Sequence, residues 1–68
     1  MIDTKKLSGI IVENGLSGRK VAAYLGIAEK TFYSKMKKGV FDSDEIYAMI
    51  DLLKINNPME VFFKKKVT

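Results

Sequence analysis

Apolar residues recur three and four positions apart along most of this 68-residue chain, as they do on one face of a helix. Glycine, asparagine and proline interrupt the pattern and divide the chain into about five short segments. No segment shows the sustained alternation of apolar and polar residues that a half-buried strand requires. The pattern predicts an all-α fold, a compact bundle of about five short helices that spans residues 1–68 as a single domain. The alternative for 61–63 is a short terminal strand.

Residues that favour helix ends lie at the boundaries of these segments. Ser17 is a good N-cap because its hydroxyl can accept a hydrogen bond from the first helical turn. Gly39 can adopt the left-handed conformation that ends many helices. Asp42 and Glu45 have the spacing of a capping box, which explains their acidic run without a metal ion. The predicted helices cover about 4–13 with Asp3 or Thr4 as cap, 18–25, 29–38, a stretch from 42–45 onwards, and a brief stretch capped by Asn57 and begun by Pro58.

The apolar face of each predicted helix defines the expected core. In the third helix, Phe32 and Met36 lie on one side at 100° per residue, and we expect this side to be buried. The opposite side carries side chains that can hydrogen-bond, namely Lys30, Tyr33, Ser34 and Lys37. The other core candidates are Leu7, Ile10, Ile11, Val21, Ala22, Leu25, Ile46, Met49, Ile50, Leu53, Met59, Phe62 and Phe63.

Charge is distributed unevenly along the chain, whose formal net charge is +4. Residues 17–40 contain six basic side chains and one acidic side chain, whereas residues 41–63 contain five acidic side chains and one lysine. A protein that needs charge only for solubility tends to mix the two signs. Concentration of positive charge in one segment favours a surface that binds phosphate groups. The lysines at 64–66 either add phosphate contacts or keep the end of the chain soluble.

Several classes of function lack the residues that they need. The chain has no cysteine and no histidine, which excludes a disulfide, a thiolate metal site and a histidine base. It has no glycine-rich phosphate loop, and its apolar runs are far shorter than the ~18 residues that span a membrane. Its first residues lack the apolar core of a signal peptide. We therefore expect no enzyme activity, no cofactor, no metal, no membrane association and no small-molecule ligand.

The segment 21–32 resembles the helix-turn-helix of phage repressor and Cro proteins. That family places a small residue midway through the first helix, a glycine four positions later in the turn, and an apolar residue six positions beyond the glycine. The matching residues are Ala22, Gly26 and Phe32, with Leu25 and Ile27 as the apolar flanks of the turn. The similarity covers about 7–63 and is greatest with small proteins of phages and prophages of low-GC Gram-positive bacteria. Two residues depart from the pattern: Ala28 stands where the family has a Ser or Thr cap, and Met36 follows the matched phenylalanine by four positions rather than three.

The resemblance implies a lambda repressor-like DNA-binding fold with a central helix-turn-helix. It implies sequence-specific binding of double-stranded DNA by a small transcriptional regulator, Cro-like or repressor-like, in the cytoplasm of a bacterial host. Helix 29–38 would then read the major groove, and a homodimer would occupy a two-fold-related operator. We expect the dimer face within 57–68, at Val61, Phe63 and Val67. The alternative is a protein-interaction module, such as an antirepressor that uses the same helical face.

Two groups of residues are candidates for contact with DNA. Side chains that can hydrogen-bond to base edges lie on helix 29–38, while the basic start of helix 18–25, with its free N–H groups, suits phosphate. The alternative for Glu29 is favourable placement at a helix N-terminus, and for Tyr33 and Ser34 it is a solvent-facing side chain without a role. The base-reading candidates are Glu29, Lys30, Tyr33, Ser34 and Lys37. The phosphate-contact candidates are Ser17, Gly18, Arg19, Lys20, Lys35 and Lys38.

Overall fold

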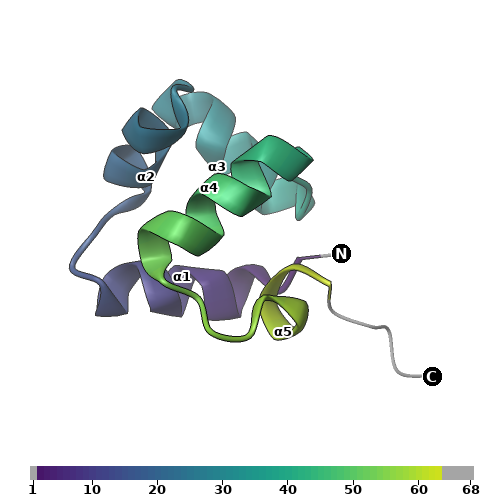
Figure 1. The fold of residues 1–68 in the computed structure, drawn as a ribbon. Helices are drawn as coiled ribbons and strands as arrows, with labels where there is room; N and C mark the ends of the chain where they lie inside the picture. Colours follow the sequence, from purple (N-terminus) through teal and green to yellow (C-terminus); the bar gives the residue numbers. More distant parts are fainter. Residues whose placement is uncertain (1, 64–68) are drawn as a thin grey trace.

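The structure, a computed structural model, describes residues 2–63, and every regular element in this range is an α-helix (Figure 1). In chain order the helices of this range are α1 (Thr4–Glu13), α2 (Gly18–Leu25), α3 (Glu29–Lys38), α4 (Ser43–Leu53) and α5 (Pro58–Phe62). The prediction of a compact all-α bundle of five short helices is confirmed. The alternative strand at 61–63 is wrong, because α5 continues to Phe62. The lysines at 64–66 and Val67 lie outside the described residues.

Short-range hydrogen bonds and glycines fix the ends of the first three helices. The Asp3 carboxylate accepts from the backbone N–H of Lys6 at 3.1 Å at the start of α1. The Ser17 hydroxyl accepts from the backbone N–H of Lys20 at 3.3 Å at the start of α2. Gly39 ends α3 with φ of 72°, a left-handed conformation that glycine adopts without steric cost. These three predicted helix ends are confirmed.

The starts of α4 and α5 differ in how they are capped. Asp42 and Glu45 form the predicted capping box at the start of α4. Asn57 precedes α5 as predicted, but its side chain makes no cap hydrogen bond. The N–H of Glu60, from which a side-chain cap could accept, donates instead to the backbone carbonyl of Asn57 at 3.2 Å.

Four side chains from four different elements fill the centre of the bundle. Figure 1 shows α1 and α5 along one edge, α2 and α3 along the opposite edge, and α4 between them. Phe41, in the loop after α3, adds a ring whose centroid lies 5.6 Å from that of Phe32. Leu7, Val21, Phe32 and Met49 are each at most 1% exposed. Ile2, Ile11, Ala22, Leu53, Val61 and Phe62 are also buried, and Ile10, Leu25, Met36, Ile46 and Ile50 pack against them.

Helix α5 presents a different face to the core than the sequence predicts. Phe62 is buried as expected, but Met59 and Phe63, also expected in the core, are 59% and 51% exposed. Val61, expected on a dimer face, is only 2% exposed and belongs to the core. The reason is the length of α5, which has five residues. Its contact with the core is filled by the adjacent Val61 and Phe62, so Met59 and Phe63, four positions apart, share the solvent side.

Candidate nucleic-acid interface

A tight turn joins α2 to α3 and determines how the two helices meet. Gly26 lies in the turn with φ of 74° and ψ of 27°, a left-handed conformation. The N–H of the next residue, Ile27, donates to the carbonyl of Ala22 at 3.0 Å. Ala22 is buried, and its methyl group lets α3 approach α2 closely. Phe32 anchors α3 from the other side of the turn, and Ala22, Leu25, Ile27 and Phe32 belong to one packed junction, with the exposed Gly26 making the turn between the helices.

Helix α3 begins without a side-chain cap and ends at a glycine. Ala28 has the extended backbone of an N-cap residue, with φ of −67° and ψ of 148°, but its side chain has no hydrogen-bonding group. The carboxylate of Glu29 lies in the first turn, where negative charge is favoured. At the other end, the N–H of Gly39 donates to the carbonyl of Lys35 at 2.8 Å. Helix α3 therefore lacks a side-chain cap at its start but has a regular hydrogen-bonded end at Gly39.

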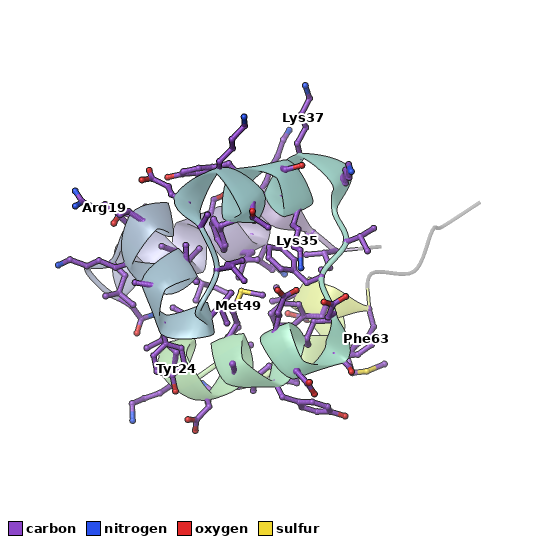
Figure 2. All side chains as sticks on the ribbon, turned by 90° about the horizontal axis from the view of Figure 1, so that it is seen from above. Arg19, Tyr24, Lys35, Lys37, Met49 and Phe63 are labelled. Carbon is purple, nitrogen blue, oxygen red and sulfur yellow. The ribbon has the colours of Figure 1, made fainter. Side chains whose placement is uncertain are left out.

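The outward side of α3 carries the base-reading candidates. Lys37 projects from α3 away from α4 in Figure 2. Met36 is half-buried against the core, as expected from its place beside Phe32. We use the term α3 outer face for Lys30, Tyr33, Ser34 and Lys37, all of which are exposed, as is Glu29.

The start of α2 places further positive charge near this surface. Arg19 projects into solvent in Figure 2, and Lys20 is also exposed. Within residues 2–63, the backbone N–H groups of Gly18 and Arg19 make no hydrogen bond. Arg19, Lys20, Lys30, Lys37 and Lys38 are exposed and have no ion-pair partner among the described residues.

Lys35 differs from the other lysines of α3 because it points inward. Its Nζ lies 2.8 Å and 2.7 Å from the two carboxylate oxygens of Glu45 and 3.5 Å from Oδ2 of Asp42. Figure 2 shows the Lys35 side chain directed toward α4. The hydrogen bond to Glu45 raises the pKa of the Lys35 ammonium above its ordinary value of 10.5, although desolvation opposes this shift. Lys35 is thus engaged within the protein, unlike the phosphate-contact role expected for it.

Glu45 explains why Lys35 adopts this position. One carboxylate oxygen of Glu45 also accepts from the N–H of Asp42 at 2.8 Å, as part of the capping box. The side chain of Glu45 is only 11% exposed, so its charge needs a nearby cation. The sequence showed the capping box and the position of Lys35 in the last turn of the predicted helix, but it gave no sign that the two meet.

Tyr33 lies against the first residue of α2, a contact that the sequence did not indicate. A Cβ atom on Gly18 would be 2.7 Å from Cζ and 2.9 Å from Cε1 of Tyr33, and nearer still to its hydroxyl oxygen. The Tyr33 ring also meets the ring of Phe32 edge-on, with centroids 5.6 Å apart. Because the two partners are 15 positions apart in the chain, only the folded arrangement of α2 and α3 brings them together.

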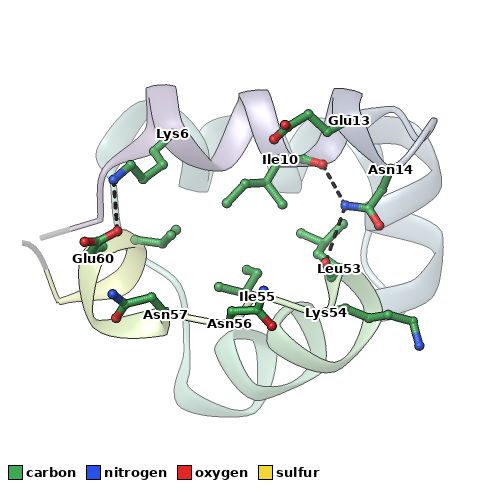
Figure 3. A pocket seen from close by; sticks show the side chains of 11 residues that line it. Lys6, Ile10, Glu13, Asn14, Leu53, Lys54, Ile55, Asn56, Asn57 and Glu60 are labelled. Carbon is green, nitrogen blue, oxygen red and sulfur yellow. Dashed lines mark hydrogen bonds and ion pairs between the residues drawn. The ribbon is translucent and has the colours of Figure 1, made fainter.

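An open groove lies between α1 and the segment that joins α4 to α5 (Figure 3). Its volume is about 480 Å³, and Ile10, Leu53 and Ile55 are among the residues that line it. The ion pair between Lys6 and Glu60, 3.3 Å long, spans one end of the groove. At the other end the Asn14 amide donates to the carbonyls of Ile10 and Leu53. These polar groups already have partners in the protein, and the groove involves none of the α2 and α3 residues described above.

No protein-family model, curated protein or solved structure matches the chain. None of the helices in residues 2–63 combines the length and the apolar character that a membrane crossing requires.

Proposed function

We propose that this chain binds double-stranded DNA sequence-specifically, as a small transcriptional regulator of phage or prophage type with a lambda repressor-like helix-turn-helix. The observation that carries the proposal is the grouping on α2 and α3 of hydrogen-bonding side chains with exposed cations that have no ion-pair partner within residues 2–63. The buried carboxylate of Glu45 already has its cation, and the other acidic residues of 41–63 belong to the segments that follow α3. The distribution of charge therefore favours one nucleic-acid-binding side.

In this proposal α3 enters the major groove and its outer face meets the base edges. The major groove is about 12 Å wide and admits a helix. Lys30 and Lys37 can donate to guanine O6 and N7, and Ser34 can donate to or accept from a base edge. The start of α2, from Ser17 to Lys20, lies against the phosphate backbone and fixes the register of α3 without reading sequence.

The number of exposed cations on α2 and α3 sets the salt dependence that the proposal requires. If each of the five exposed cations named above contacts one phosphate, the slope of log K against log salt reaches about −4.5 per protomer. Lys35 is excluded from this sum because Glu45 neutralises it.

We further propose a homodimer, because one small unit presents a single reading helix and a two-fold operator needs two. Met59 of α5 and Phe63, the residue directly after α5, support a face at this end of the bundle, since they are apolar, exposed and four positions apart. Val61 no longer contributes to this face because it is buried.

The test begins with selection of bound duplexes from a random library, followed by binding measurements on the selected and on unrelated sequences over a range of salt. Lys30→Ala and Ser34→Ala should weaken binding to the selected duplex more than to unrelated duplexes. Arg19→Ala should weaken both and lower the salt slope by about one unit. Lys5→Ala, which removes an exposed lysine of α1, is the matched control.

Equal losses on all sequences for Lys30→Ala, Ser34→Ala and Arg19→Ala would contradict the assignment of the α3 outer face. Absence of duplex binding at low salt would refute the DNA-binding proposal and favour the antirepressor alternative.

A further inference from the structure

Gly18 matters for the space that it leaves to Tyr33 rather than for its backbone conformation, since any side chain at this position would displace the Tyr33 phenol. Its φ lies outside the left-handed range in which Gly15, Gly26 and Gly39 are found. The three atoms nearest to a Cβ at this position all belong to the phenol of Tyr33, and an alanine would overlap them. Because Gly18 has no side chain, the Tyr33 ring can occupy the space beside it.

Two groups pack against the Tyr33 ring. One is the backbone of Gly18, and the other is the edge-on ring of Phe32, which is itself buried. The hydroxyl end of Tyr33 lies beside Gly18, at the start of α2. Tyr33 is 50% exposed, so part of its side chain remains accessible to a partner from outside.

We propose that Tyr33 contacts the DNA backbone together with the start of α2, and that Gly18 is the positioning residue that holds its ring there. This inference rests on the proposed DNA binding. A phosphate that reaches the free N–H groups of Gly18 and Arg19 also comes within reach of the Tyr33 hydroxyl, which can donate to it. The sequence-reading part of the α3 outer face is then Lys30, Ser34 and Lys37.

The first test compares binding to the selected duplex with binding to unrelated duplexes. Tyr33→Phe removes the hydroxyl and keeps the ring, so it should weaken both by the same factor, about threefold to tenfold. Gly18→Ala displaces the ring and should also weaken both equally. Ser34→Ala is the matched control, because it should weaken the selected duplex preferentially. A Tyr33→Phe variant that loses binding only to the selected duplex would overturn the backbone role.

The second test measures the contact between Gly18 and Tyr33 without DNA. Gly18→Ala should lower the midpoint of thermal unfolding in the wild-type chain. In a Tyr33→Ala chain the same substitution should leave the midpoint unchanged or raise it, since alanine favours a helix more than glycine does. An equal effect of Gly18→Ala in both chains would overturn the contact. The two proposals can fail separately. If wild-type protein binds no duplex, both the proposed DNA binding and the contact of Tyr33 with the DNA backbone are refuted. The packing of Tyr33 on Gly18 is still supported in that case if Gly18→Ala lowers the unfolding midpoint only in the chain that keeps Tyr33.

Discussion

Replacement of Ala28 by serine should stabilise the protein at the start of its proposed reading helix. Ala28 already has the extended backbone of an N-cap, so a serine there can direct its hydroxyl at the first turn without rearrangement. A side-chain cap contributes about 1 kcal/mol, within a range of roughly 0.5–2 kcal/mol. For a domain of this size, 1 kcal/mol corresponds to a rise of about 4–8 °C in the midpoint of thermal unfolding.

The assay is thermal and urea unfolding followed by far-ultraviolet circular dichroism. Ala23→Ser is the matched control, since Ala23 is an exposed residue within α2 where serine offers no cap and costs roughly 0.5 kcal/mol in helix propensity. Ala28→Asp should stabilise as Ala28→Ser does, yet weaken duplex binding because it adds a carboxylate beside Lys30. If Ala28→Ser unfolds at or below the wild-type midpoint, as the control should, the inferred cap geometry of α3 is refuted.

Two further predictions concern the inward lysine and the exposed side of α5. Because the pKa of Lys35 is raised in the folded state, its contribution to stability is complete below pH 10.5 and is lost as the pH rises through the folded pKa. As the pH rises from 9 to 12, the urea concentration at the midpoint of unfolding should therefore fall less steeply for Lys35→Arg, which keeps the cation, than for wild type. Parallel curves for the two proteins would contradict a stabilising role of the Lys35 charge. Phe63→Ser should shift the proposed dimer toward monomer in sedimentation equilibrium. Val12→Ser, which replaces an exposed apolar residue of α1, is the control. An unchanged mass for Phe63→Ser would exclude the proposed dimer face.

Local signals predicted the helix ends because their effects act over a few residues. Ser17 needs only the N–H three positions later, and Gly39 needs only its own backbone freedom. The burial of Phe32 followed from helical spacing over three turns, which is long enough for the period to be clear. In α5 the same reasoning was wrong for Met59 and Val61, because five residues do not define a face.

The sequence predicted which residues of the candidate site are exposed, but it did not predict the contacts between helices that position them. Exposure of Lys30, Ser34 and Lys37 follows from the pattern of one helix. The ion pair of Lys35 with Glu45 and the packing of Tyr33 on Gly18 each join two helices. Such contacts depend on how the helices cross and on which side-chain rotamers fit, and neither is encoded in the spacing of residues within a helix.

Backbone hydrogen bonds of Ile2 and Asp3 affect how the protein unfolds. The N–H of Ile2 donates to the carbonyl of Gly39 at 3.3 Å, and the N–H of Asp3 donates to the carbonyl of Val61 at 2.7 Å. Here, detachment of Ile2 and Asp3 removes hydrogen bonds from the end of α3 and from α5 at the same time, and it withdraws the buried Ile2 side chain from the core. Release of residues 2–3 is thereby coupled to the end of α3 and to α5, which favours unfolding of the bundle as one cooperative unit.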